Sequence, residues 1–347
     1  MPLSKNATFR QLAAFHTVAR VGSVSLAADE MHLTQSAVSI QIGILEESAG
    51  TPLIQRVGRG IRLTEAGDLL ALYAKRILDM WREAGEEMAT LQGVFSGTLR
   101  VGAVTTAEYL LPPLLVMFAD EHPKVNVKLQ VGNRDEIVKL LASQEIDLAI
   151  MGRPPAELKT HSTAFAKHPM AFVAAPGHAL MTDPALSIAT LAEARILVRE
   201  RGSGTRTTVE RLFKDAGHRL HIGSEMSSNE AIKQMCAAGF GVAFLSLHTC
   251  VLEMNAGMLE LVPVAGNPIE RDWYVIQLAA RQLPQVALAF EKFLREQGQT
   301  LLRRQLAPKP PAGLAAVAAP PRKRAVSSRS AKPSAPPSRA GGAAKLR

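Results

Sequence analysis

The chain has 347 residues, of which 47% are hydrophobic, enough to bury the cores of two or three domains. It contains no run of about 18 apolar residues, and its first segment, MPLSKNATFRQL, lacks the apolar region of a secretory signal, so we expect a cytoplasmic protein that has no membrane partner. The formal net charge of +9 is concentrated in residues 303–347, which hold eleven Lys and Arg and no acidic residue, whereas the rest of the chain has 29 basic and 31 acidic residues; overall charge therefore cannot by itself indicate nucleic-acid binding.

Residues 8–47 predict three short helices. In SLAADEMHLTQSAVSIQIGILEE, apolar residues at helical spacing flank a break at HLT, so each half can bury one face. This arrangement is typical of a helix-turn-helix, spanning about Val24 to Gly43, whose second helix enters the major groove by its N-terminal end. That end is capped by Thr34 or Ser36 and presents the amide of Gln35, which can bond the edge of adenine. The alternative is an ordinary helical hairpin with solvated polar residues.

The next segment, TPLIQRVGRGIRLT, predicts a β-hairpin with arginines at positions 56, 59 and 62. A wing of this kind beside a reading helix can bring Arg side chains to phosphates or to the minor groove. The alternative is a solvated hairpin, which fits Arg62 better than Arg56 or Arg59.

Residues 65–93 predict one long helix. Its apolar residues recur with an average spacing of 3.5, the period of a coiled-coil seam, so we expect it to dimerise. The alternative is a helix that packs on its own domain. The seam residues are Leu70, Tyr73, Ile77, Trp81, Ala84, Met88 and Leu91.

Residues 97–297 alternate short β-branched runs with helical patterns, which predicts α/β units on mostly parallel sheets. About 200 residues suit two lobes, and a ligand would lie between them beyond the carboxyl ends of the strands. Residues 303–347 are rich in Ala, Pro and Ser and predict a disordered basic tail, which either is inert or adds phosphate contacts.

With these features, the sequence resembles the LysR-type transcriptional regulators. The resemblance rests on LAAFHTVARVGSVSLAADEMHLTQSAVSIQIGILEESAGTPLIQR and RGIRLTEAGDLLALYAKRIL and extends over about residues 7–297. It implies an all-α winged helix-turn-helix domain over 7–64, a dimerising linker helix, and an α/β effector domain of two periplasmic-binding-protein-like lobes. The first lobe would comprise about 97–167 and 271–297, and the second about 168–270.

The family resemblance also implies partners. They are double-stranded promoter DNA, RNA polymerase, a small-molecule effector and further copies of the chain in a homodimer or homotetramer. The stretches RERGSGTRTTVERLF and GSEMSSNEAIKQMCAAGFGVAFLS are most similar to the branch that controls Calvin-cycle operons, so we expect an activator of carbon-fixation genes. Matching the family motif places DNA contacts on Thr34, Gln35, Ser36, Ser39, Ile40, Gln41, Arg56 and Arg59; Ser36 replaces a common proline and Ile40 a common arginine.

An effector site is predicted from hydroxyl, amide and arginine groups that follow strands or begin helices, because such groups bind anions. A sugar phosphate or NADPH would fit. Arg199 is better explained by pairing with Glu200, and the hydroxyls could simply cap helices. The candidate residues are Thr105, Thr106, Asn133, Arg134, Gly152, Arg153, Arg201, Ser203, Gly204 and Thr205.

The competing classes are a regulator of a different operon, an α/β metabolic enzyme and a solute-binding protein for transport. Gly239 and Gly241 precede a strand rather than open a helix, so they form no dinucleotide fingerprint, and neither a P-loop nor a nucleophile elbow is present. The nine histidines lack metal-ligand spacing, and Cys236 and Cys250 lie in apolar stretches typical of reduced thiols. We therefore expect no catalytic residue, no metal and no resident cofactor.

Overall fold

The helix-turn-helix predicted near the N-terminus is present in the computed structural model, which describes residues 7–57, 60–91, 95–183 and 186–306. Three helices bury a small core in which Ala27, Ala28, Val38 and Ile42 are almost fully inaccessible. Alanines at this crossing let the helices approach closely. The elements are α1 (Phe9–Val21), α2 (Val24–Glu30), α3 (Gln35–Ala49) and the hairpin strands β1 (Ile54–Val57) and β2 (Gly60–Leu63).

Side-chain caps fix where these helices begin. The Thr8 hydroxyl accepts from the Gln11 amide and the Gln11 side chain accepts from the Thr8 amide, a capping box that starts α1. Thr34, not Ser36, caps α3, because its hydroxyl accepts from the Ala37 amide at 3.2 Å.

The long helix α4 (Glu65–Leu91) begins inside the DNA-binding domain. Gly67 lies against the Leu53 carbonyl, and a Cβ atom at this position would be 2.0 Å from that oxygen. Leu70 is buried in the same domain, so it belongs to the intramolecular core rather than to the predicted seam. Farther along, Met88 is 58% exposed, and Trp81 is 65% exposed although its ring contacts that of Phe9. The described residues therefore leave much of this apolar face exposed.

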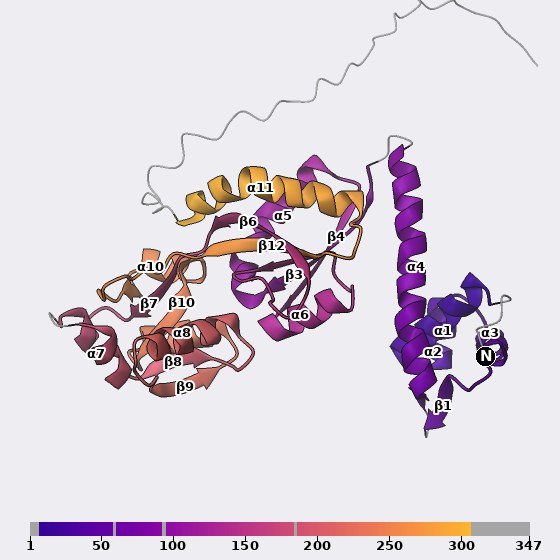
Figure 1. Ribbon diagram of the computed structural model, residues 1–347, viewed down its shortest axis with the longest axis horizontal. Helices are drawn as coiled ribbons and strands as arrows, with labels where there is room; N and C mark the ends of the chain where they lie inside the picture. Colours follow the sequence, from indigo (N-terminus) through magenta and orange to yellow (C-terminus); the bar gives the residue numbers. More distant parts are fainter. Residues whose placement is uncertain (1–6, 58–59, 92–94, 184–185, 307–347) are drawn as a thin grey trace, which may run out of the picture. The chain divides into compact units, whose positions relative to one another are not determined.

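The first lobe is a five-stranded sheet of order β4-β3-β5-β12-β6 (Figure 1). The first three strands are parallel, and β12 runs antiparallel to both of its neighbours. Figure 1 shows α5 and α6 on opposite faces of this sheet, and the two helices belong to separate apolar clusters. The elements are β3 (Gly97–Val104), the 3-10 helix η1 (Thr105–Tyr109), α5 (Leu111–Glu121), β4 (Val125–Gly132), α6 (Arg134–Ala142), β5 (Leu148–Met151), β6 (Thr160–Lys167), β12 (Asp272–Leu278) and α11 (Gln285–Leu306).

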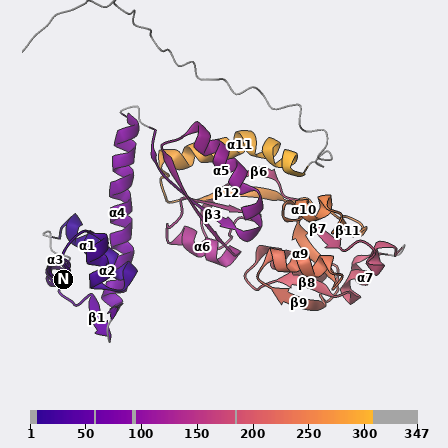
Figure 2. The same cartoon turned by 180° about the vertical axis from the view of Figure 1, so that it is seen from behind.

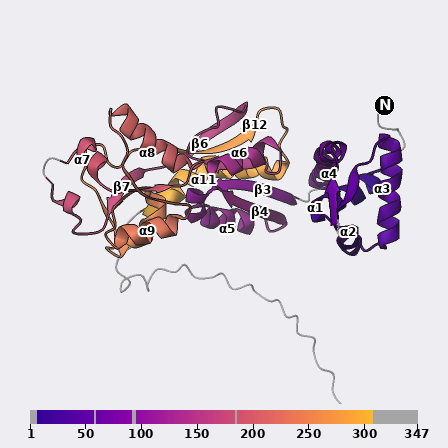
Figure 3. The same ribbon diagram turned by 90° about the horizontal axis from the view of Figure 1, so that it is seen from below.

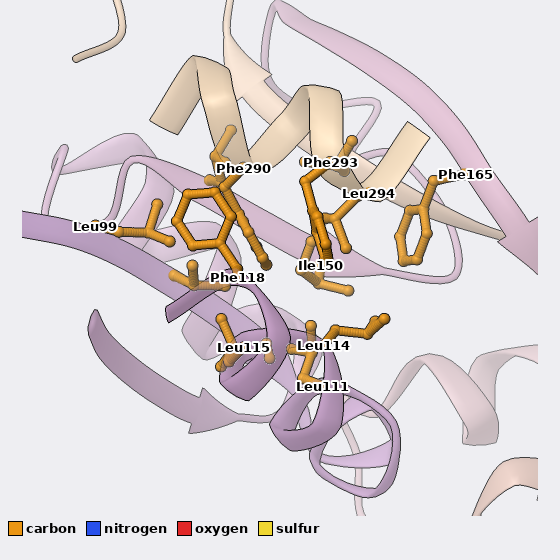
Figure 4. Packing of buried hydrophobic residues seen from close by; sticks show 14 of the residues in the cluster. Leu99, Leu111, Leu114, Leu115, Phe118, Ile150, Phe165, Phe290, Phe293 and Leu294 are labelled. Carbon is orange, nitrogen blue, oxygen red and sulfur yellow. The ribbon is translucent and has the colours of Figure 1, made fainter. Parts of the chain in front are cut away.

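Helices α5 and α11 share the core on one face of this sheet. Phe118 of α5 meets Phe290 and Phe293 of α11 at ring-centroid distances of 5.0 and 5.7 Å (Figure 4). Each such aromatic pair adds about 1 kcal/mol beyond its buried area. The last helix is therefore a structural part of the first lobe.

The prediction that the chain becomes disordered from residue 303 is wrong at its beginning. Helix α11 continues to Leu306, because Leu302 is buried in the core of the first lobe. Residues 307–347, which make up the rest of the predicted tail, lie outside the described residues.

The second lobe is another five-stranded sheet, of order β11-β7-β10-β8-β9. Separate apolar clusters cover its two faces, one beneath α8 and one beneath α9. Figure 2, seen from behind, shows α9 over β8. The elements are β7 (Met170–Ala174), η2 (Ala179–Met181), α7 (Ile188–Glu193), β8 (Ile196–Arg199), α8 (Gly204–Asp215), β9 (Ile222–Met226), α9 (Asn229–Ala237), β10 (Val242–Ser246), η3 (Leu247–Thr249), α10 (Val251–Asn255) and β11 (Glu260–Leu261).

The chain passes between the lobes twice, and the two passages are hydrogen-bonded to each other. The His168 amide donates to the Arg271 carbonyl at 2.7 Å, and the Arg271 amide donates to the His168 carbonyl at 3.2 Å. The two-lobed α/β fold expected from the sequence is thus confirmed. No described helix is long and apolar enough to cross a membrane.

Candidate functional site

The outer face of α3 carries the polar residues predicted to read DNA. Gln35, Ser36 and Ser39 are exposed, whereas Val38 and Ile42 of the same helix face the core. Figure 3 shows α1 and α2 on one side of α3 only. The first turns of α3 therefore combine a packed inner face with an accessible outer face.

The hairpin places two of its arginines on opposite faces. Arg62 pairs with Gln55, and Arg56 pairs with Ile61, so the strand alternation separates the two guanidinium groups. Arg56 shares its face with Ile54 and Ile61, which pack on the helix-turn-helix core. Arg59 lies outside the described residues.

A cavity of about 710 Å³ lies between the two lobes and gathers most of the predicted effector residues. This volume is within the range of small-molecule sites. Arg201 is the exception, because it is exposed and does not line the cavity. The predicted residues on its wall are Thr105, Thr106, Asn133, Arg134, Gly152, Arg153, Ser203, Gly204 and Thr205.

Two helix N-termini open onto this cavity, one from each lobe. In α6, the Asn133 side chain accepts from the Glu136 amide and the Glu136 carboxylate accepts from the Asn133 amide, so its first turn is partly satisfied. In α8, the Ser203 hydroxyl makes no capping bond, which leaves first-turn amides of this helix available to an anion.

Arginines give the cavity wall a formal excess of two positive charges, since four arginines and two aspartates line it. Arg134 is held by Glu157 and Arg211 by Asp215. Arg271 instead donates to the Thr208 hydroxyl and to the Gly152 carbonyl, neither of which carries charge. Burial, followed by the like charge of Arg153, lowers the pKa of Arg271. An anion in the cavity would relieve this repulsion.

Arg199 has a structural role, as its sequence context suggested. It is 1% exposed, donates to both oxygens of Glu200, and donates to the Asn229 side-chain oxygen at 2.6 Å. It also donates to the Thr105 hydroxyl at 2.9 Å. The alternative that the candidate hydroxyls only cap helices is wrong for Thr105 and Thr106, because η1 has no side-chain cap bond.

His168 and Arg271 line the cavity and were missed from the sequence. His168 stacks on Trp273 at a ring-centroid distance of 3.7 Å. Burial holds its pKa well below the usual range, and His248 and Arg271 add to the shift. Burial also lowers the pKa of His248 to about 4. The only signal for these residues is their position just before strands β7 and β12, which follow the two passages between the lobes.

Metal-binding chemistry has no support among the residues that the structure describes, which contain no group of three or more His, Cys, Asp or Glu able to hold an ion. Cys236 and Cys250 are buried free thiols, and burial raises the pKa of Cys236 to about 11. Neither thiol is poised to react.

Two family models match the chain. Residues 9–68 match the bacterial regulatory helix-turn-helix protein of the lysR family, and residues 92–299 match the LysR substrate binding domain. The CbbR regulator of Rhodospirillum rubrum is 42% identical over 291 residues, covering 84% of this chain and 97% of the relative. The RuBisCO operon transcriptional regulator of Allochromatium vinosum is 38% identical over 287 residues, covering 83% and 95%.

Two solved structures are also similar to this chain. The regulatory domain of CcmR from Synechocystis PCC6803, in complex with 2-PG, is 35% identical with a TM-score of 0.56, covering 58% of this chain and 97% of that one. Full-length CbnR complexed with its target DNA has a TM-score of 0.63 at 23% identity, covering 83% and 99%, a likeness of fold.

Proposed function

The chain belongs to the LysR family of bacterial transcriptional regulators, and we propose that it controls a carbon-fixation operon in response to a phosphorylated anion bound between its lobes. The matched family consists of regulators, so the enzyme alternative is set aside. Regulators named for RuBisCO operons are among its relatives over most of their length. Binding to chromosomal promoter DNA would take place in the cytoplasm.

We infer an anionic ligand from the excess of arginines that line the cavity. Arg271 has no carboxylate partner among the described residues, and Arg153 has no ion pair there, although both line one wall. With the open first turn of α8, this wall offers several charge-assisted donors to one phosphate or carboxylate. The relative that binds 2-PG supports a small phosphorylated acid, and a sugar phosphate or NADPH is the second candidate.

The DNA-binding residues belong to the same proposal. We assign base contacts to the outer face of α3 and phosphate or minor-groove contacts to Arg56 and Arg59. The exposed apolar face of α4 supports a homodimer, and two dimers would form the homotetramer that bends promoter DNA and contacts RNA polymerase. The assigned reading residues are Thr34, Gln35, Ser36, Ser39, Ile40 and Gln41.

Two experiments test the proposal. Genomic fragments captured by the full-length protein and sequenced should be enriched in promoters next to carbon-fixation genes. Enrichment of the promoter of another operon would establish the alternative target. If no fragment is enriched over random fragments, the proposed sequence-specific binding to promoters is rejected.

Calorimetric titration of the full-length protein with 2-phosphoglycolate, a sugar bisphosphate and NADPH tests the ligand. At least one should bind with one site per chain and raise the unfolding temperature. Absence of binding by all three, or equal binding of neutral glycerol, would contradict an anion site.

A further inference from the structure

Two aliphatic side chains lie on the face of α3 that points away from the core. Ile40 is 59% exposed and Ile44 is 39% exposed, one helical turn apart and in line with Ser36. Val38, Ile42 and Leu45 of the same helix, which do pack inside, are at most 2% exposed. Neither Ile40 nor Ile44 belongs to an apolar cluster of the DNA-binding domain, so the fold does not require them.

The part of this face from Ser36 to Ile44 is uncharged. Helix α3 contains no Lys or Arg, and its only ionisable residues are Glu46 and Glu47 near the C-terminal end. Its first turns therefore present hydroxyls, amides and an aliphatic surface, but no cation that would attract phosphate. This composition suits contacts with base edges and with apolar groups of the bases.

The major groove has one prominent apolar group, the C5 methyl of thymine. Ile40 is in the second turn of α3, close to the N-terminal end by which a reading helix enters the groove. Its neighbours Ser39 and Gln41 can bond base edges on either side. The side chain is thus placed where an aliphatic contact would distinguish thymine from the other bases.

We propose that Ile40 is a specificity-determining residue that reads thymine through its C5 methyl group. This inference rests on the proposed DNA-binding function. It gives the operator a thymine requirement in each half-site that the hydrogen-bonding residues of α3 do not create.

The test uses the full-length protein and the genomic site that it protects in footprinting. Each thymine of that site is replaced singly by uracil, which removes only the methyl group. Burial of one methyl is worth about 0.8 kcal/mol, so at one or two thymines per half-site the wild-type protein should bind about fourfold more weakly. Ile40→Ala should bind the thymine duplex several-fold more weakly than the wild type does. Its affinity should not fall further when thymine is replaced by uracil.

Matched variants separate this contact from general effects. Leu252→Ala removes a similar aliphatic group that is 72% exposed on α10, and it should keep the wild-type ratio of thymine to uracil affinity. Ile40→Val should keep part of that ratio. Unchanged unfolding temperatures would show that the variants fold, as expected for an exposed residue.

Failure of this inference differs from failure of the DNA-binding function. If the wild-type protein prefers its site over a scrambled duplex but is indifferent to every uracil replacement, the role of Ile40 is overturned and the function stands. A full thymine preference retained by Ile40→Ala also overturns it. No preference for the site over the scrambled duplex would instead reject the proposed function.

Discussion

The guanidinium of Arg199 donates a 2.9 Å hydrogen bond to the hydroxyl of Thr105, which ties strand β8 of the second lobe to the cavity wall in the first. Because Arg199 is almost fully buried, this bond forms where water offers little competition. The Thr105 hydroxyl therefore has a partner within the protein. It links the two lobes in addition to facing the cavity.

Replacing Thr105 by valine should weaken this link. Thr105→Val keeps the shape but leaves a guanidinium N–H without its acceptor, so the free energy of unfolding should fall by about 1–3 kcal/mol. Denaturant unfolding followed by far-UV circular dichroism measures this free energy of unfolding. Thr105→Ser, which restores the hydroxyl, should recover most of the loss, and equal stability of all three proteins would show that the bond contributes nothing.

Arg153 should contribute directly to anion affinity. It is exposed on the cavity wall, so Arg153→Gln removes a charge without disturbing a core. A lost charge-assisted bond costs about 1.5 kcal/mol, which predicts roughly tenfold weaker binding of 2-phosphoglycolate by calorimetry. Arg219→Gln, an exposed arginine of the second lobe outside the cavity, is the control and should bind as wild type. Equal weakening in both variants would indicate a nonspecific charge effect.

Two glycines of α4 should respond in opposite ways to the same substitution. At Gly67 the new methyl would lie 2.0 Å from the Leu53 carbonyl oxygen, a backbone atom that cannot move away cheaply, so Gly67→Ala should destabilise the DNA-binding domain by 2 kcal/mol or more, on the order of a core overpacking. At Gly85 nothing lies within 4 Å, and Gly85→Ala should stabilise the helix by about 1 kcal/mol. Thermal unfolding compares the two variants with the wild type. A change in stability of the same sign in both variants would contradict the close packing at Leu53.

Stability should fall as the solution becomes acidic, because His248 is buried in its neutral form. An unfolded imidazole binds a proton below about pH 6.5, whereas the folded one does so only near pH 4. The stability from this residue is therefore complete above pH 6.5 and is lost as the pH falls toward 4, by about 3 kcal/mol in total, with a further loss from His168.

Unfolding free energies of wild type and His248→Leu, measured from pH 7 to 4, isolate this contribution from that of the carboxylates. The variant should show the shallower decline. His218→Gln, at an exposed position, should follow the wild-type curve, and parallel curves for all three proteins would exclude the burial effect.

A charge on the apolar face of α4 should weaken self-association. Met88 is 58% exposed in the single chain, so Met88→Glu would place a carboxylate in the proposed seam. Sedimentation should show a dissociation constant at least about tenfold higher than wild type. Leu252→Glu, the same charge on an exposed leucine of the second lobe, should not change it; an unaltered Met88→Glu assembly would place the dimer contact elsewhere.

The sequence predicts local features well because they depend on neighbours in the chain. The Thr34 cap, the buried Val38 and Ile42 and the exposed Ser39 all follow from spacing within one helix. The effector residues at the starts of α6 and α8 follow from the rule that helix N-termini meet beyond parallel strands. Arg201 shows the limit of the rule, because this residue is only two positions before Ser203 yet does not line the cavity.

Features set by contacts distant in sequence could not be predicted. His168 and Arg271 are about a hundred residues apart and meet only because the two passages between the lobes pair with each other. The sequence predicts that the effector domain ends at residue 297, but Gly298 continues helix α11 and packs against Phe165, where a Cβ would lie 2.7 Å from the ring. That tertiary contact favours a glycine at this position within the helix, and helix α11 continues to Leu306.

The paired passages restrict how the lobes can move. Because the backbones of His168 and Arg271 are joined in both directions, one passage cannot slide without dragging the other, and the lobes are left mainly with a bending motion about this pair. The Arg271 side chain projects from the same pivot to Gly152 in one lobe and Thr208 in the other. An anion bound by this guanidinium would therefore contact the segment about which the two lobes can bend.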